Sequence, residues 1–433
     1  QSFRRHRRHA FGLGAVISDL RYAARLARAY FTLARFDVAL PQALRRQIPV
    51  PLRVGGGLAR LVLGMPRGGR EDKPSRLAAA LTALGPAYVK LGQFLATRPD
   101  ILGTDLAGSL RELQDRMPAF AMPKAMAIVA HELGAPASEL FAEISPPVAA
   151  ASIAQVHKAR LKSGEWVAVK VLRPCIEKAF ARDMAAFAWA ARLAERKGGT
   201  EAKRLEPVKL VETLAQSVRM ELDLRFEAAA ASEIADSSAH AESFVLPPIH
   251  WNLTTQRVLT TGWIAGIPMG EMAALDKAGI DRPALARELL QLFLRQALHN
   301  GLFHADLHTG NLFVLPASGE DVRTRIAAVD HGIIGRLDKR MRRFIAETLY
   351  GFITRDYMRI ANAHFDTGIV GHPHTREEFA QALRSIGEPV FGHRARDISM
   401  ARLLAQLFEV TALFDMHMQP QLALLQKTMV VVE

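Results

Sequence analysis

The sequence predicts an α+β fold of two lobes preceded by a helical extension. Three observations predict it: helical sequence before residue 146, short β-like runs from 146 to 265, and mainly helical sequence after that. The helical stretches place apolar residues three and four positions apart, whereas the β-like runs are short and bounded by turn residues. Two lobes of this kind enclose a cleft, where we expect the functional groups to lie.

The predicted organisation has four parts. Residues 1–74 form a basic segment and linker, and 75–145 form the helical extension. Residues 146–265 form an N-terminal lobe rich in β-structure, and 266–433 form a helical C-terminal lobe. Periodicity and turn residues predict the local elements. They are a helix from near Ser75 through Leu91, a hairpin of Ile153–Leu161 and Trp166–Leu172, helices over 176–198 and 207–236, strands at Phe244–Leu246 and Arg257–Ile264, and a helix over 283–299 ending at Asn300-Gly301.

The composition indicates a folded protein with an anionic partner. Of the 433 residues, 49% are hydrophobic and 23% are charged, which argues against extended disorder. The net charge of +13 and pI near 10.1 favour anionic lipid, a phosphate-bearing ligand or nucleic acid. Nucleic-acid binding is not expected, because the arginines are spread out with few interleaved aromatics. The one cysteine, Cys175, excludes an internal disulfide and suits a reducing compartment.

The basic segment near the N-terminus has two interpretations. Residues 11–37 mix apolar side chains with Arg21, Arg25, Arg28 and Arg35. Such a helix suits an anionic membrane surface, but it equally suits packing against the rest of the protein. Both interpretations stay open. The stretch Val54–Lys73 is rich in glycine, arginine and lysine and is predicted to be a linker.

One short motif in the C-terminal lobe indicates phosphoryl transfer. His304-Ala305-Asp306 is followed by Asn311, which gives the spacing H-x-D-x-x-x-x-N. In that chemistry the aspartate accepts or orients the attacking hydroxyl and the asparagine holds magnesium. A metal site made of His304, Asp306 and His308 is the alternative.

A second carboxylate follows a buried strand further along the chain. Asp330-His331-Gly332 comes directly after the apolar run 326–329. This arrangement is typical of the principal magnesium ligand of kinases, with His331 in place of the usual phenylalanine. The exchange leaves the metal ligand intact, and it puts in doubt any regulatory flip that buries an aromatic ring. Asn311 and Asp330 are therefore the predicted metal ligands.

The N-terminal lobe supplies the predicted nucleotide contacts. Val167-Ala168-Val169-Lys170 matches the lysine motif whose ammonium contacts the α and β phosphates. Glu227, on the predicted 207–236 helix, is our choice for its carboxylate partner. Upstream lies a stretch with the spacing of a phosphate-binding glycine loop but with alanine in the glycine places, and it should be stiffer than the usual loop. Its residues are Ala149, Ala150, Ala151, Ser152, Ile153, Ala154, Gln155 and Val156. Together these motifs predict ATP and Mg²⁺ as cofactors.

Two further motifs resemble those of one particular family. Lys90-Leu91-Gly92-Gln93 and Glu221-Leu222-Asp223 resemble the K-x-G-Q and E-x-D motifs of the UbiB family of atypical, protein-kinase-like kinases and ATPases. The alanine-rich loop is similar to that of the same family. The resemblance covers roughly residues 75–433. One departure is Ala154, where many relatives have glycine, and we expect this exchange to alter nucleotide preference or turnover.

The resemblance implies a bilobal protein-kinase-like fold whose N-terminal helical extension lies over the cleft. It implies that Lys90 pairs with Glu221 or Asp223 and that these three residues, with Lys170 and Asp306, form the catalytic set. It also implies ATPase or lipid-handling behaviour in ubiquinone biosynthesis at the membrane. We therefore expect a location at the bacterial cytoplasmic face of the inner membrane. The expected partners are ATP, a membrane lipid or ubiquinone precursor, the anionic membrane surface and other ubiquinone-biosynthesis proteins.

Family members often carry apolar membrane-spanning segments after the kinase-like domain, and this chain stops about where such a tail would begin. Two other functions stay open. One is a small-molecule phosphotransferase, because H-x-D-x-x-x-x-N with His308 and Gly310 also resembles aminoglycoside and choline kinases. The other is a nucleotide-gated lipid-binding module with little turnover, because Asp306 does not show that an acceptor can reach it.

Overall fold

The structure is a computed structural model. It describes residues 2–36, 73–96, 110, 117–197, 206–239, 241–317, 324–371, 373–389, 410, 413, 414, 416 and 420–432. The predicted linker at 54–73 therefore lies almost entirely outside the described residues. The chain divides into two compact units, 1–228 with 249–263, and 229–248 with 264–433. Each unit is described by itself below, and the boundaries of the four predicted parts stay predictions.

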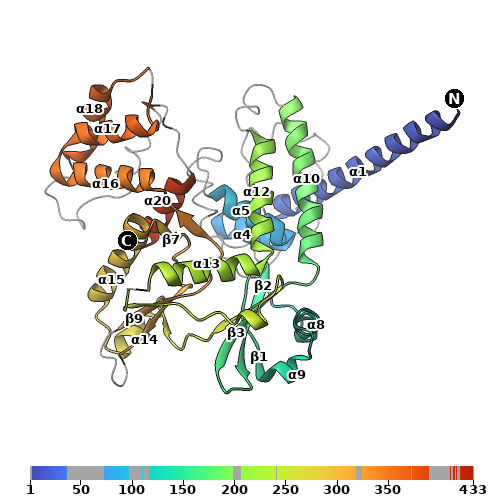
Figure 1. Cartoon of the computed structure of the whole chain (residues 1–433). Coiled ribbons are helices and arrows are strands. Elements are labelled where there is room, and N and C mark those ends of the chain that lie inside the picture. The colour runs from blue at the N-terminus through green and yellow to red at the C-terminus, as the bar shows by residue number, and fades with distance from the viewer. Residues whose placement is uncertain are drawn as a thin grey trace. The chain divides into compact units, whose positions relative to one another are not determined.

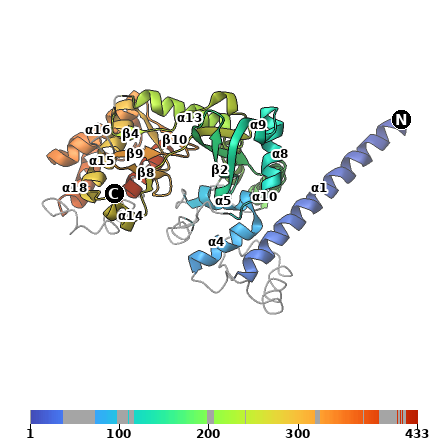
Figure 2. The same ribbon diagram turned by 90° about the horizontal axis from the view of Figure 1, so that it is seen from below.

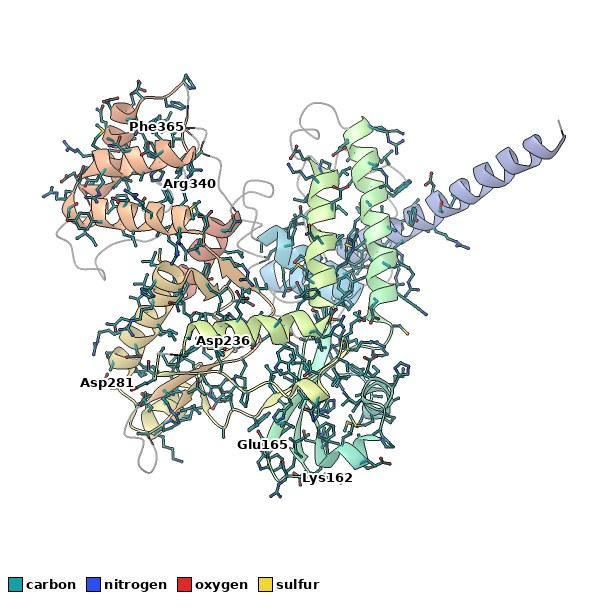
Figure 3. All side chains as sticks on the ribbon, viewed as in Figure 1. Lys162, Glu165, Asp236, Asp281, Arg340 and Phe365 are labelled. Carbon is teal, nitrogen blue, oxygen red and sulfur yellow. The ribbon has the colours of Figure 1, made fainter. Side chains whose placement is uncertain are left out.

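Unit 1 contains a four-stranded antiparallel sheet in the order β1-β2-β3-β5 (Figure 1). The predicted hairpin is confirmed, and its turn carries Lys162 and Glu165 (Figure 3). A strand that the sequence did not predict precedes it and begins before residue 146. The strands are β1 (Phe141–Ala150), β2 (Ala154–Leu161), β3 (Trp166–Leu172) and β5 (Val258–Gly262).

The two-residue period of β3 decides which face Lys170 occupies. Val167, Val169 and Val171 are fully buried in a core that includes α8 (Met122–Leu133). Because side chains alternate along a strand, Lys170 lies on the opposite face. Leu172 shares that face and belongs to the larger core, which is formed mainly by helices.

The helical part of unit 1 contacts this second face. Its core combines apolar residues of six helices with Ala154, Leu172 and Leu259 of the sheet. The C-terminal half of α1 contributes Ala29 to this core, and α1 contacts α4 and α10 (Figure 2). The packing interpretation of the basic helix is thus confirmed, and membrane binding stays a prediction. The six helices are α1 (Ser2–Arg35), α4 (Lys73–Leu84), α5 (Pro86–Ala96), α10 (Ile176–Lys197), α12 (Pro207–Glu221) and α13 (Leu224–Ser237), which contributes Leu224 and Ala228.

The prediction of one continuous helix from Ser75 through Leu91 is wrong. The chain breaks between α4 and α5 at Gly85, whose φ is 113°, a value that glycine adopts readily because it has no Cβ. Pro86 then begins α5, because proline suits the first turn of a helix. The predicted position of these helices over a cleft involves both units and stays a prediction.

Unit 2 contains a second four-stranded sheet in the order β4-β9-β8-β6 and a two-stranded sheet of β7 and β10. The stretch after residue 283 is thus less uniformly helical than predicted, because β7 to β10 all fall within it. The strand predicted at Phe244–Leu246 is present, and it pairs with β9 of unit 2. The strands are β4 (Phe244–Val245), β6 (Ile267–Pro268), β7 (Leu302–His304), β8 (Leu312–Leu315), β9 (Arg325–Ala328) and β10 (Ile334–Arg336).

Helices complete unit 2 around two apolar cores. The predicted helix over 283–299 is confirmed as α15, and its N-cap is Asp281, which is labelled in Figure 3. The Asp281 side chain accepts a hydrogen bond from the Ala284 amide. A π-helical turn, Arg295–Asn300, extends it to Gly301 at φ 73°. In the described part of the chain, no helix is both long and apolar enough to cross a membrane. The helices are α14 (Met272–Lys277), α15 (Arg282–Leu294), α16 (Lys339–Thr354), α17 (Tyr357–Thr367), α18 (Arg376–Gly387) and α20 (Pro420–Val432).

Candidate functional site

Lys170 of β3 and Glu227 form the predicted ion pair. The Lys170 Nζ lies 2.8 Å from Glu227 Oε1 and 2.9 Å from Oε2, so one ammonium contacts both oxygens. The side chains are only 14% and 12% exposed. Glu227 lies in the first turn of α13 (Leu224–Ser237), where the partial positive charge of a helix N-terminus favours a carboxylate. The pair therefore fixes the position of the lysine ammonium at the sheet.

The predicted single helix over 207–236 is wrong, because it is two helices. α12 ends at Glu221, and α13 begins after Asp223. The Asp223 carboxylate accepts hydrogen bonds from the backbone amide of Arg225 and from its guanidinium. This is the role of a helix N-cap, and the bonds from Arg225 lower the pKa of Asp223. The break puts Glu221 at the end of one helix and Glu227 at the start of the next.

Lys90 of α5 takes Glu221 as its partner. The Lys90 Nζ lies 2.6 Å from Glu221 Oε2, with side chains 13% and 12% exposed. Of the two partners that the resemblance allowed, the structure thus selects Glu221, while Asp223 pairs with Arg225. Gly92 is buried in α5 and Gln93 is half-buried. Unit 1 therefore holds two nearly buried lysine–carboxylate pairs, on either side of one helix break.

The alanine-rich loop is the connection from β1 to β2. Ala149 and Ala150 end β1, and the Ala151 amide donates to the Ala154 carbonyl at 2.8 Å. Arg173, which the sequence did not single out, donates to the Ala151 carbonyl through both Nε and Nη2. Ser152 is fully buried. The loop is thus held by hydrogen bonds within unit 1, and its stiffness stays a prediction.

Gln155 of the same loop faces the protein interior. Its side chain is fully buried, accepts a hydrogen bond from the Phe120 amide at 2.9 Å and contacts His157 at 3.0 Å. Burial lowers the pKa of His157. Ile153 and Ala154 are also buried, whereas Ala149, Ala150, Ala151 and Val156 are partly or fully accessible. Of the predicted nucleotide contacts in this loop, only the accessible residues have side chains available to a ligand in this conformation.

In unit 2, His304 connects the loop after β7 to the end of β9. Its Nδ1 accepts a hydrogen bond from the Asp306 amide at 3.1 Å, and its Nε2 lies 3.3 Å from the Val329 carbonyl. The ring is fully buried, and burial lowers its pKa. A neutral ring with the proton on Nε2 satisfies both contacts. His304 thus joins the backbone amide of Asp306 to the backbone carbonyl of Val329, which directly precedes Asp330.

The same loop places Asn311 beside Asp306. The Asn311 Nδ2 donates to the Asp306 backbone carbonyl at 3.2 Å, which leaves the amide oxygen as the atom suited to a cation. The Val329 amide donates to the Asn311 carbonyl at 2.9 Å. The two predicted metal ligands, Asn311 and Asp330, are thus carried by segments that are hydrogen-bonded to each other.

Asp330 has an uncommon backbone conformation. Its φ is 61°, in the left-handed region that few residues other than glycine adopt, although aspartate tolerates it better than most. Such conformations concentrate at functional sites. His331 is buried, and its ring lies 4.9 Å from that of His304. The histidine therefore takes a buried position in which its ring contacts His304.

The donor set fits magnesium and does not fit the alternative histidine site. Asp330 and Asn311 offer hard oxygen atoms, and Mg²⁺ commonly takes one or two protein ligands with water and phosphate completing its shell. Both ring nitrogens of His304 are already engaged, and His308 Nε2 lies 3.8 Å from Asp306 Oδ2. Within the described ranges, no group of three or more His, Cys, Asp or Glu residues is arranged to hold a metal.

Family models match two stretches of this chain. Residues 112–364 match the ABC1 atypical kinase-like domain, and 383–433 match the UbiB helical domain. A Marinobacter nauticus protein named Probable protein kinase UbiB is 42% identical over 406 residues, covering 93% of this chain and 72% of that protein. An Azotobacter vinelandii protein of the same name is 40% identical over 367 residues, covering 84% of this chain and 68% of that protein.

A solved structure shares the fold. The complex of Rv3197 with erythromycin from Mycobacterium tuberculosis matches with a TM-score of 0.55 and 24% identity, covering 82% of this chain and 89% of that one. At this identity the likeness bears on the fold alone. Together with the kinase-like domain match, it confirms the predicted α+β, protein-kinase-like class.

Proposed function

Because the chain belongs to the UbiB family of ABC1 atypical kinase-like proteins, we propose that it is an ATP- and Mg²⁺-dependent kinase or ATPase that supports ubiquinone biosynthesis at the membrane. The observation that carries the nucleotide part is the Lys170–Glu227 pair, at 2.8 Å and across 57 residues of sequence. In kinases this pairing holds the lysine ammonium ready for the α and β phosphates.

In this proposal each remaining site residue has one task. Asp306 accepts the proton of the attacking hydroxyl or water, and His304 holds the backbone amide of Asp306 in place. Asn311 and Asp330 would hold magnesium. The metal, when bound, neutralises charge on the β and γ phosphates. Lys170 and the accessible part of the alanine-rich loop bind the nucleotide phosphates.

The reaction balances as a simple displacement. The oxygen of the acceptor, or of water, forms a new bond to the γ-phosphorus while the bond from that phosphorus to the β–γ bridging oxygen breaks. ADP leaves with that electron pair. The proton of the attacking oxygen passes to the Asp306 carboxylate and then to solvent.

The Lys90–Glu221 pair favours nucleotide turnover over phosphorylation of a protein. The pair is nearly buried and joins α5 to the end of α12 within unit 1. While the pair is formed, the Lys90 ammonium is not available to phosphate and the Glu221 carboxylate is not available to metal. The pair can therefore regulate nucleotide binding, which we call its gating role. The gating role rests on the family resemblance together with this distance.

The membrane part of the proposal has separate support. The net charge of +13 favours an anionic surface, and α1 is rich in arginine. We propose a location at the cytoplasmic face of the bacterial inner membrane, with a membrane lipid or ubiquinone precursor and other ubiquinone-biosynthesis proteins as partners. The family resemblance supports the link to ubiquinone.

An ATP hydrolysis assay tests the proposal. The purified chain is measured with and without Mg²⁺, anionic liposomes and a ubiquinone-precursor mimic. We expect Mg²⁺-dependent release of phosphate that rises with liposomes and the mimic and is lost in Asp306→Asn. Hydrolysis that persists unchanged in Asp306→Asn would come from another source and would contradict the assignment.

A further inference from the structure

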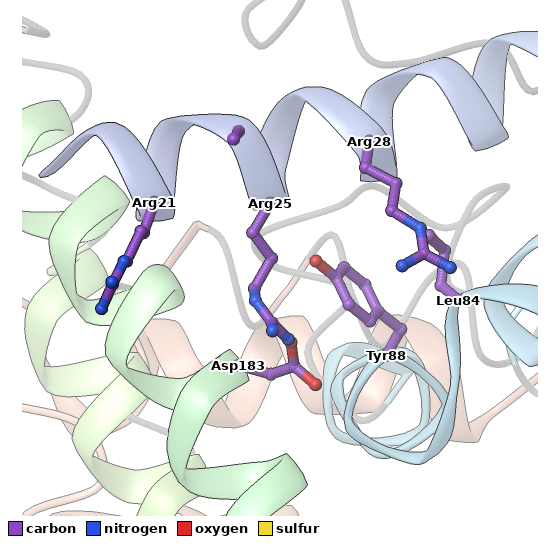
Figure 4. A pocket seen from close by; sticks show the side chains of 7 residues that line it. Arg21, Arg25, Arg28, Leu84, Tyr88 and Asp183 are labelled. Carbon is purple, nitrogen blue, oxygen red and sulfur yellow. The ribbon is translucent and has the colours of Figure 1, made fainter. Parts of the chain in front are cut away.

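Unit 1 has a pocket between α1, α10 and the α4–α5 turn, and none of the predicted nucleotide contacts lines it. Its volume is about 390 Å³, within the range of about 300–1,000 Å³ that is usual for small-ligand sites. Figure 4 shows three arginine side chains extending from α1 toward α5 and α10. The lining residues are Arg21, Ala24, Arg25, Arg28, Leu84, Tyr88 and Asp183.

The charges that line this pocket are unbalanced. Arg21, Arg25 and Arg28 are spaced i, i+4 and i+7, so they share one face of α1. Arg25 forms an ion pair with Asp183, the only carboxylate among the described residues of the lining. In the part of the chain that the structure describes, Arg21 and Arg28 make no ion pair. The described residues of the lining therefore carry an excess of two positive charges, because three arginines face one aspartate.

A buried hydroxyl in the same pocket has no hydrogen-bond partner within the described residues. Tyr88 is 7% exposed, and its Oη is buried without a hydrogen bond. Its ring is held edge-to-face against Phe187 at 5.0 Å. Figure 4 shows the hydroxyl directed toward α1, between Arg25 and Arg28. Burial raises the pKa of Tyr88 to about 12, so the hydroxyl keeps its proton and can donate. A buried polar group without a partner is uncommon in native structures, and a hydrogen-bond acceptor in this pocket would satisfy the hydroxyl.

We propose that this pocket binds a phosphate ester, with Arg21 and Arg28 contacting the phosphate oxygens and Tyr88 donating one hydrogen bond. Guanidinium groups suit phosphate because their planar donors can bind two oxygens at once. The volume leaves room for an organic group beside the phosphate, against Leu84 and Ala24. The inference is independent of the proposed phosphoryl transfer, because it uses none of the nucleotide or metal residues.

Two sources offer this chemistry, a free phosphate ester and a lipid headgroup. In either case the ligand would join α1 to α5, because Tyr88 lies on α5 and the arginines lie on α1. Tyr88 is two positions before Lys90 on the same helix. Occupancy of the pocket should therefore steady the helix that carries the Lys90–Glu221 pair.

The test uses the full chain with three probes: glycerol 3-phosphate by calorimetry, and phosphatidylglycerol or phosphatidylcholine vesicles by co-sedimentation. The pocket variant is Arg21→Gln with Arg28→Gln, and a second variant, Tyr88→Phe, removes only the hydroxyl. The control, Arg192→Gln with Arg196→Gln, removes the same charge from exposed positions on α10 outside the lining.

We expect saturable binding of glycerol 3-phosphate or of phosphatidylglycerol vesicles but not of phosphatidylcholine vesicles. The affinity for the anionic probe should fall at least about 10-fold in the pocket variant and about 3-fold in Tyr88→Phe. It should fall less than about 2-fold in the control. Binding of the free ester identifies a soluble ligand, and binding of vesicles alone identifies a headgroup. Equal losses in the pocket and control variants, or no saturable binding of either anionic probe, would overturn the inference.

Discussion

Lys90 and Glu221 form an ion pair of 2.6 Å between α5 and the last residue of α12, with both side chains nearly buried. The two residues lie far apart in sequence and each belongs to a motif of its own. Their contact joins the helical extension to α12. The next helix, α13, carries Glu227, which pairs with Lys170.

Breaking this pair should change both stability and nucleotide binding. Loss of one partner of a buried pair leaves the other charge uncompensated, which costs about 3–5 kcal/mol when burial is complete. We expect Lys90→Ala to lower the melting temperature and to shift the ratio of ATP to ADP affinity. The exposed pair Lys209–Glu206 supplies the control, because Lys209→Ala should change neither.

A double-mutant cycle shows whether the two residues act together. ATP and ADP binding are compared for wild type, Lys90→Ala, Glu221→Ala and the double variant. We expect the double variant to be clearly less affected than the sum of the single variants. Strictly additive effects would mean that the residues are not coupled, and the gating role would have to be abandoned.

Asp223 should act as a helix cap rather than as a metal or nucleotide ligand. Asp223→Ala removes the hydrogen bond to the Arg225 amide and should cost about 1 kcal/mol. Asp223→Asn keeps a capping oxygen, so it should retain most stability and ATP affinity in thermal and calorimetric measurements. Asp281→Ala, which removes the cap of α15, is the matched control and should lose stability without losing ATP affinity. A full loss of ATP binding in a stable Asp223→Asn would instead assign the carboxylate a direct role.

His364 should make unit 2 sensitive to acid. Burial lowers its pKa from 6.5 to about 4, and its ring packs against Phe344 and Phe379. Because the unfolded chain binds the proton first, stability is fully present above pH 6.5 and is lost as the pH falls toward 4. The expected loss is about 2 kcal/mol between pH 7 and pH 5.

Denaturant unfolding at several pH values measures this dependence. His364→Phe should reduce the change in unfolding free energy between pH 5 and pH 7, whatever its effect on absolute stability. His299→Phe changes an exposed histidine of the same unit and should leave this pH dependence unaltered. An unaltered pH dependence in His364→Phe would show that other groups carry the acid sensitivity.

The sequence predicted the local motifs well because each depends on residue type and spacing alone. Lys170 follows alternating valines, so its strand and face are determined by a two-residue period. The pairing with Glu227 followed from the kinase-like order of the motifs. The α+β class followed from the change between helical and strand periodicity along the chain.

The two errors in helix continuity have one physical cause. Apolar periodicity continues across both breaks, so it does not reveal them. The signals were nevertheless present, since Gly85-Pro86 is a helix-breaking pair and Asp223 is a good N-cap residue. Tertiary contacts complete the second break, because the Leu224 amide donates to the Gln256 carbonyl.

Other contacts could not be predicted from spacing. Arg25 meets Asp183 across 158 residues, and Arg173 ties down the alanine-rich loop from the end of β3. The residue type and its place in a helix or at the end of a strand do not distinguish these arginines from other arginines of the chain. The positive φ of Asp330 is likewise invisible in sequence, although the glycine two positions on is consistent with a tight turn.

In the proposed mechanism, Asp330 holds magnesium for a bound nucleotide. The most direct measurement is the thermal shift produced by MgATP in wild type, Asp330→Asn and the control Asp366→Asn, an exposed residue of α17. Asparagine tolerates the same left-handed backbone, so Asp330→Asn removes charge with little added strain. We predict a clear shift in wild type and in the control and little or none in Asp330→Asn. An Asp330→Asn variant with the full wild-type shift would contradict the assignment.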